Sequence, residues 1–116
     1  MEQNRAMDVH HPTREELELV SVLHALSDPV RLQIVRALDQ ADGAVACGQF
    51  PLPVGKSTAS HHFRVLREAG VASSRDEGTR RYHSLRRDDL DARFPGLLDT
   101  VLRASESDRA PRTAHR

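Results

Sequence analysis

The stretch VGKSTASHHFRVLREAG, residues 54–70, decides how the rest of the chain is interpreted. Three functional patterns overlap in it. GKS is the ending of a phosphate-binding loop, two adjacent histidines suggest a metal-ligand pair, and hydroxyl and basic residues at helical spacing suggest contact with DNA. Each pattern assigns the protein to a different functional class, so the choice among them comes first.

An amphipathic α-helix explains the spacing of the apolar residues in this stretch. Ser57 or Thr58 can cap its start, and Gly70 lies just past its end, where a residue with positive φ is common. The residues predicted to face the core are Ala59, Phe63, Leu66 and Ala69, with His62 at their margin. The opposite face presents Ser57, Ser60, His61, Arg64 and Arg67.

The phosphate-loop and metal-pair interpretations both fail on residue spacing. A phosphate-binding loop needs a glycine at position 50, which is Phe50, and Pro51 and Pro53 remove backbone N–H donors that such a loop uses. Adjacent helical residues point about 100° apart, whereas two metal ligands on one helix are usually four residues apart. His61 and His62 are therefore not predicted to share a metal ion, and contact with DNA is the interpretation that remains.

Charge is unevenly distributed along a chain whose formal net charge is zero. Residues 54–87 contain eight basic and three acidic side chains, a net charge of +5, whereas residues 1–53 carry −4 and residues 88–116 carry −1. A basic segment between acidic ones is typical of a protein with one face for a polyanion. A solvated charged surface is the other explanation.

One small domain accounts for most of the 116 residues. We predict a mainly α fold with a small β-hairpin and an aliphatic core, because aromatic residues are few. Residues 1–13 are predicted to be a flexible N-terminal arm, residues 14–104 the folded domain, and residues 105–116 a disordered tail.

Capping and turn residues divide this domain into elements. Thr13 and Glu16 form a capping box for a first helix, which ends at the SDP of residues 27–29. Asp28 caps a second helix, whose predicted inward residues are Val30, Ile34, Val35 and Leu38 and whose predicted outward residues are Arg31, Gln33 and Arg36. Then follow a short third helix over residues 44–50, a hairpin over residues 71–85, and a helical segment over residues 88–104 whose regular part begins near Pro95.

Three segments carry a family resemblance: LHALSDPVRLQIVRAL (23–38), KSTASHHFRVLREAGV (56–71) and EGTRRYHSLR (77–86). They resemble the second helix, the recognition helix and the wing of the arsenic-repressor (ArsR/SmtB-type) winged-helix regulators, over about residues 16–104. The resemblance implies a winged helix-turn-helix, a dimer through the first and last helices, and an inverted-repeat DNA operator. The family's DNA-contacting positions match Lys56, Ser57, Ser60 and His61.

Two sets of site residues follow from the resemblance and from the helix face. The predicted DNA-binding residues are Lys56, Ser57, Thr58, Ser60, His61, Arg64, Arg67, Arg75, Arg80 and Arg81. The predicted dimer-interface residues are Leu19, Val22, Leu23, Leu26, Phe94, Leu97, Leu98, Val101 and Leu102. Two apolar terminal helices support a dimer independently, because they present more apolar surface than a small core covers, although packing within one chain is the alternative.

The predicted function is a sequence-specific transcriptional regulator, a homodimeric repressor in the cytoplasm that binds double-stranded DNA. The effector is left open: a protein, a small ligand, a metal or none. The alternative is a dimeric winged-helix interaction module whose DNA specificity depends on a partner protein. We predict no catalytic residues, since the chain has no nucleophile elbow, Gly-rich loop or framed carboxylate pair. The sequence shows no signal peptide and no long apolar run, so no membrane contact is expected.

The cofactor is left open, because the usual metal sites of the family are missing. One type uses Cys-x-Cys near the third helix, where this chain has only Cys47, predicted to be a small buried residue. Another uses His and carboxylates on the last helix, which here has no His. His10 and His11 in the arm are the remaining candidates for a nickel or zinc site, and a solvated arm without metal is the alternative. Further donors are Asp8, His24 and His115.

Overall fold

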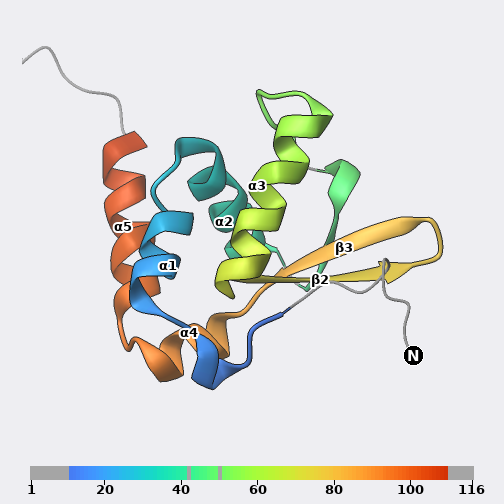
Figure 1. Ribbon diagram of the computed structural model, residues 1–116. Helices are drawn as coiled ribbons and strands as arrows, with labels where there is room; N and C mark the ends of the chain where they lie inside the picture. Colours follow the sequence, from blue (N-terminus) through green and yellow to red (C-terminus); the bar gives the residue numbers. More distant parts are fainter. Residues whose placement is uncertain (1–10, 42, 50, 110–116) are drawn as a thin grey trace, which may run out of the picture.

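The computed structural model describes residues 11–41, 43–49 and 51–109. Its α-helices are α1 (Leu19–Ala25), α2 (Pro29–Gln40), α3 (Lys56–Ala69), α4 (Arg87–Arg93) and α5 (Leu97–Arg109), and its 3₁₀ helices are η2 (Arg14–Glu16) and η3 (Cys47–Gln49). The strands β1 (Val45–Ala46), β2 (Ala72–Glu77) and β3 (Arg80–Leu85) form an antiparallel sheet in the order β1-β3-β2. The helices gather on one side, and the β2–β3 hairpin extends away from them (Figure 1). No helix within these residues has the length and apolar character to cross a membrane.

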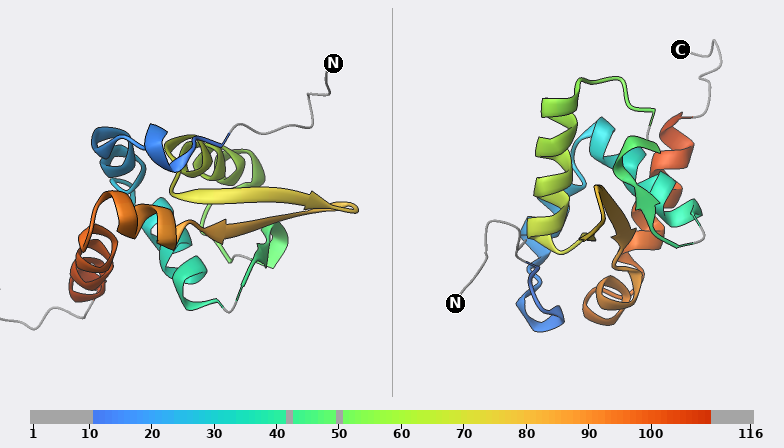
Figure 2. Two further views of the ribbon diagram at one scale, coloured as in Figure 1. Left: turned by 90° about the horizontal axis from the view of Figure 1, so that it is seen from below. Right: turned by 90° about the vertical axis from the view of Figure 1, so that its right-hand side faces the viewer.

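The core is aliphatic, as predicted, with Phe63 as the one aromatic side chain among its described buried apolar residues. Every α-helix contributes to it, and the views from below and from the side show the helices wrapped around the inner end of the hairpin (Figure 2). The predicted inward residues Ile34, Val35 and Leu38 of α2 are buried, and Val30 packs against the core. The core thus holds α2 and α3 together at the base of the hairpin.

The first helix differs from its prediction. The carboxylate of Glu16 accepts a hydrogen bond from the Thr13 backbone N–H (2.9 Å), but this contact caps the short helix η2 and not α1. Leu17 and Glu18 are extended, so α1 begins only at Leu19. This break turns Leu17 into the core against Gly70, which has φ +84 and lacks the Cβ that would overlap the Leu17 side chain.

Two later segments also differ. Residues 45–49 form strand β1 and the 3₁₀ helix η3 where an α-helix is predicted, because Val45 and Ala46 pair with the free edge of β3 opposite His83 and Tyr82. The C-terminal helical segment is two helices that meet at residues 94–96. Helix α5 then continues to Arg109, beyond the predicted domain end at residue 104. The predicted arm before residue 11, the tail from residue 110 and the side chain of Cys47 lie outside the described part.

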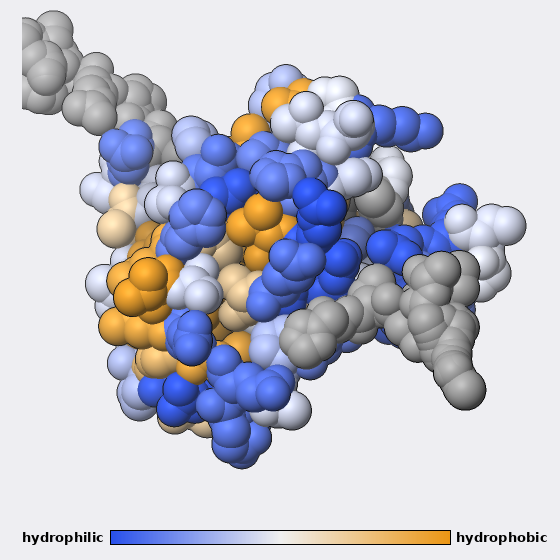
Figure 3. Space-filling model, viewed as in Figure 1, coloured by the Kyte–Doolittle hydropathy of each residue, from blue (hydrophilic) through white to orange (hydrophobic). Residues whose placement is uncertain are grey.

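The predicted dimer-interface residues divide into two groups. Val22, Leu26, Leu98 and Leu102 are buried in the chain's own core. Leu19 and Leu23 of α1 are exposed, together with Val20, which is 79% exposed, and we call these three residues the α1 patch. Phe94, Leu97 and Val101 are half-buried. Apolar surface gathers over the side of the molecule that carries α1 and α5 (Figure 3).

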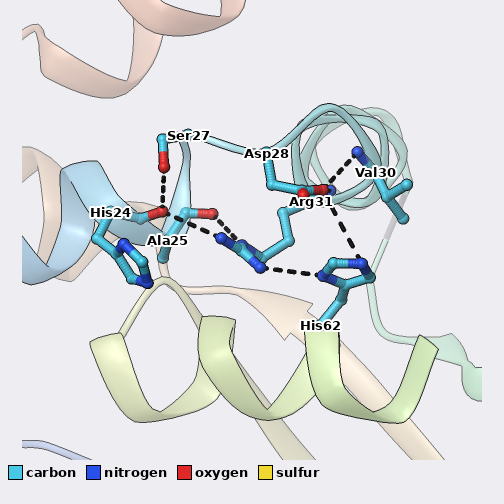
Figure 4. Close-up of polar contacts among 7 residues, drawn as sticks. All are labelled: His24, Ala25, Ser27, Asp28, Val30, Arg31 and His62. Atoms are coloured by element: carbon cyan, nitrogen blue, oxygen red, sulfur yellow. Dashed lines mark hydrogen bonds and ion pairs between the residues drawn. The ribbon is translucent and has the colours of Figure 1, made fainter. Parts of the chain in front are cut away.

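Arg31, predicted to point outward, is instead buried and 7% exposed. Its guanidinium donates hydrogen bonds to the carbonyls of Ala25 (2.8 Å) and His24 (3.3 Å), at the C-terminal end of α1, and to Nδ1 of His62 on α3 (3.0 Å). Asp28 caps α2, as predicted, by accepting from the backbone N–H groups of Val30 and Arg31, and it lies 3.9 Å from His62 Nε2 (Figure 4). One buried network therefore joins α1, α2 and α3.

We predict that Arg31→Ala lowers the free energy of unfolding by about 3 kcal/mol, because two carbonyls and an imidazole nitrogen lose their buried donor. Urea unfolding followed by circular dichroism measures the change. The matched control is Arg103→Ala, which removes an exposed arginine from α5 and is expected to shift stability by less than about 0.5 kcal/mol. Equal stability losses in the two variants would contradict a structural role for the buried guanidinium.

Candidate nucleic-acid interface

Helix α3 has two chemically distinct faces. Its buried residues are His62, Phe63, Leu66 and Ala69. Its exposed residues in the N-terminal half are Lys56, Ser57, Thr58, Ser60, His61 and Arg64, all predicted to meet DNA. The N-cap is Gly55, so the predicted caps Ser57 and Thr58 lie inside the first turn with their hydroxyls on the surface. Gly55 supplies no side-chain cap, and the first backbone N–H groups are left for an anion or water.

The two adjacent histidines of α3 have different environments. His62 is buried in the Arg31 network, whereas His61 is exposed. Nδ1 of His61 lies 3.2 Å from Nη2 of Arg64. A guanidinium can only donate, so Nδ1 accepts, and in the neutral ring Nε2 carries the proton. His61 therefore presents a hydrogen-bond donor to the solvent side of α3.

The hairpin forms the predicted wing, and its tip carries charges of both signs. Arg81 donates two hydrogen bonds to Asp76 (2.8 and 3.2 Å), and this hydrogen bonding outweighs the small effect of burial and holds the pKa of Asp76 below its ordinary value. Arg75 lies 3.7 Å from Glu77. Arg80 is exposed next to the turn at Gly78. Two of the three wing cations predicted to bind DNA are thus close to carboxylates within the hairpin.

Arg67, which is predicted to bind DNA, and His83 of the wing both lie deeper than the exposed face of α3. Arg67 is half-buried, and its Nε atom has no hydrogen-bond partner among the described residues. Its burial, with the neighbouring Arg81, lowers the pKa of Arg67. His83 is 1% exposed and stacks on Phe63, which agrees with a packing role.

Part of the basic segment is used inside the protein. Arg86 donates to the Pro12 carbonyl (2.7 Å) and to Asp89 (2.9 Å). Arg87 donates to Asp39 on α2 (2.5 Å) and to Asp99 on α5 (3.1 Å). These arginines hold α4 against its neighbours. Sequence reasoning missed this use, and the only available signal was the run of acidic residues that follows them at 88–91.

The described residues offer no metal centre. They contain no group of three or more His, Cys, Asp or Glu side chains that could hold an ion. Of the candidates in the arm, His10 lies outside the described residues, and His11 uses Nε2 to accept a hydrogen bond from the Ser74 backbone N–H (3.0 Å). His11 therefore ties the end of the arm to the outer edge of β2.

Comparison with known proteins assigns the family. A helix-turn-helix domain model matches residues 26–75, which run from the end of α1 into the hairpin. An uncharacterised HTH-type transcriptional regulator of Bacillus subtilis, YceK, is 39% identical over 82 residues, covering 69% of this chain and 82% of that protein. The biofilm growth-associated repressor of Xylella fastidiosa is 35% identical over 72 residues, covering 58% of this chain and 63% of that protein.

A comparison with solved structures shows the same fold in a transcriptional regulator. The crystal structure of an ArsR family transcriptional regulator, RHA00566, superposes with a TM-score of 0.59 at 18% identity, covering 81% of this chain and 98% of that one. The similar proteins are regulators and not enzymes. With a winged helix whose α3 exposes hydroxyls, an imidazole and basic groups, the chain belongs to the helix-turn-helix family of transcriptional regulators, and it has the fold of an ArsR family member.

Proposed function

We propose that the protein is a homodimeric repressor that binds an inverted-repeat operator with one α3 helix per half-site. The observation that carries the proposal is the exposed N-terminal half of α3, where six polar or basic side chains stand opposite a buried apolar face. A helix of this kind fits the major groove, with hydroxyls and an imidazole at base edges. Lys56 and the uncapped first turn suit a backbone phosphate.

Only a few side-chain atoms on the exposed face of α3 are suited to recognising bases. His61 offers Nε2–H, which suits an acceptor such as O6 or N7 of guanine. Ser57 and Ser60 can donate or accept, so they adapt to either strand. Arg64 donates a hydrogen bond to Nδ1 of His61. Because Arg64 is exposed on the same face of α3, its guanidinium can also contact a phosphate. Base recognition is therefore assigned to Ser57, Ser60 and His61.

The dimer is proposed to form through the α1 patch and the half-buried apolar residues of α5. Leu19, Val20 and Leu23 are large apolar side chains left exposed on one helix, and exposed clusters of this kind mark interfaces. Two-fold symmetry then matches the symmetry of an inverted repeat, whose half-site centres lie about 34 to 36 Å apart. Repression is proposed from similarity to the Xylella fastidiosa protein, which is named a repressor. The described residues give no reason to include a metal.

We predict that Ser60→Ala and His61→Ala each reduce discrimination between operator and scrambled DNA by about 1 to 3 kcal/mol, because each removes a base contact. Arg80→Ala is expected to weaken binding to both duplexes alike and to reduce the slope of log affinity against log salt by about 0.9 per lost phosphate contact. Fluorescence anisotropy on the DNA upstream of the gene, at several salt concentrations, measures both quantities, with Arg103→Ala as control.

Two results would count against the proposed DNA face. One is discrimination that Ser60→Ala and His61→Ala leave unchanged. The other is equally weak binding of the unmodified protein to both duplexes, which favours a winged-helix interaction module whose specificity comes from a partner protein.

We predict that Leu23→Glu weakens dimerisation more than tenfold, which corresponds to about 1.4 kcal/mol, because the substitution places a charge in an apolar interface. Sedimentation equilibrium measures the dimer constant, and circular dichroism checks that the helices persist. Gln40→Glu, a surface charge at the far end of α2, is the control and is expected to leave the constant unchanged. A Leu23→Glu protein that is still fully dimeric would place the interface elsewhere.

A further inference from the structure

The wing leaves the body of the protein at one residue pair. Ser74 of β2 and His83 of β3 are register partners, and they are the outermost buried residues of the hairpin. Beyond them, β2 is exposed throughout, and β3 has only half-buried or exposed positions. The hairpin tip therefore has no buried residue of its own; strand β1 supports one side of β3 as far as Tyr82, and the pair is the last buried part of the hairpin before the tip, which extends away from the helices (Figure 1).

His83 contacts three elements, two through its side chain and one through its backbone. Its ring lies flat on the ring of Phe63 on α3, with centroids 4.0 Å apart and an angle of 11° between the planes. Its Nδ1 is hydrogen-bonded with the hydroxyl of Ser74 on β2 (2.8 Å). Its backbone pairs with Val45 of β1. Stacked rings resist both separation and tilting, so the contact defines an angle as well as a distance.

The stacked ring belongs to the part of α3 that is proposed to read DNA. Phe63 lies three residues after Ser60 and directly before Arg64, both on the exposed face. The backbone of Phe63 belongs to the same turn of α3 as these residues. The wing and this turn of α3 are thus joined through the buried His83–Phe63 stack.

The surroundings of His83 keep its ring uncharged, which suits a buried residue that fixes the position of the wing. Burial, together with the nearby guanidinium groups of Arg81 and Arg67, lowers the pKa of His83 to about 4, and Asp76 opposes them only weakly. Val45 brings no charge from β1. The imidazole is therefore neutral at neutral pH, and its protonation would add a third positive charge beside Arg67 and Arg81.

We propose that His83 is a positioning residue for DNA binding, which holds the wing at a fixed angle to α3 so that both reach the same DNA duplex. The inference rests on the proposed function and adds to it a residue that makes no DNA contact itself. Its side chain acts through Arg80 at the wing and through Ser60 and Arg64 on α3. Without the stack, the wing still forms. Its basic side chains, however, no longer reach the DNA phosphates that lie beside the wing when α3 is bound.

A double-mutant cycle between His83→Leu and Arg80→Ala tests the proposal. Leucine keeps a buried apolar side chain but removes both the stack and the hydrogen bond. In the unmodified background, Arg80→Ala is expected to lower operator affinity severalfold and to reduce the salt slope. In the His83→Leu background, Arg80→Ala is expected to change neither quantity, because the wing is already out of position. His83→Phe, which keeps the stack, is expected to restore most of the Arg80 effect.

The outcomes separate this proposal from the proposed function. If Arg80→Ala lowers affinity by the same factor in both backgrounds, His83 does not position the wing. If the unmodified protein binds its operator but Arg80→Ala has no effect, the wing makes no contact and the proposal is wrong. If His83→Leu does not fold by circular dichroism, Phe63→Leu, which removes the stack from the α3 side, replaces it in the cycle with the same expectations. Failure of the unmodified protein to discriminate DNA sequences counts against the proposed function itself.

We predict that His83 also makes stability sensitive to acid. The folded-state pKa, about 4, lies below the ordinary value of 6.5, so folding favours the neutral ring. The resulting stability is fully present above about pH 6.5 and is lost as the pH falls toward 4. Urea unfolding at pH 7 and pH 5 is expected to show a smaller loss in His83→Phe than in the unmodified protein. Equal losses in the two proteins would contradict a buried, neutral His83.

Discussion

The buried guanidinium of Arg31 is the contact on which the placement of the DNA-facing helix depends. A guanidinium has five N–H donors and no acceptor, and a buried one is tolerated only where acceptors surround it. Here the acceptors come from the end of α1 and from His62 on α3. Because α1, α2 and α3 must be correctly placed at once to satisfy the group, this network favours one arrangement of the three helices over looser alternatives.

His62 and Asp28 complete this arrangement through the hydrogen bonds that they make. Arg31 donates to Nδ1 of His62, so the neutral ring carries its proton on Nε2, facing the carboxylate of Asp28. Partial burial favours the neutral carboxyl, but hydrogen bonds from the backbone N–H groups of Arg31 and Val30 outweigh it and hold the pKa of Asp28 below its ordinary value. The carboxylate then caps α2 and lies close to the His62 ring, so one side chain both starts a helix and orients its neighbour.

Sequence patterns correctly predicted the elements whose caps and turns are formed by residues close in the chain. The Asp28–Pro29 start of α2, the end of α3 at Gly70 and the hairpin around Gly78 all depend on residues close in the chain. Arg31 was assigned to the surface because a charged side chain usually lies there, and its partners are distant in sequence. Strand β1 has only two residues, and it exists because β3 offers an edge, which no propensity of residues 44–49 reveals. In the candidate site, the exposed face of α3 was predictable from helical spacing, whereas the stacking of His83 on Phe63 was not.

The use of the basic residues bears on how such a protein would bind DNA. Arg86 and Arg87 hold α4 in place, Arg81 is paired with Asp76, and Arg67 is half-buried. The basic groups that stay exposed on α3 and the wing are Lys56, Arg64, Arg75 and Arg80. So few phosphate contacts give one protomer only weak affinity for any DNA, and affinity depends on ion release at each contact. Under the proposed function, tight binding then requires two protomers on one operator, which raises the effective concentration of the second α3 once the first is bound. Under the same proposal, weak binding to arbitrary DNA and strong binding to a paired site are what we expect of a protein that uses half of its basic segment within the fold.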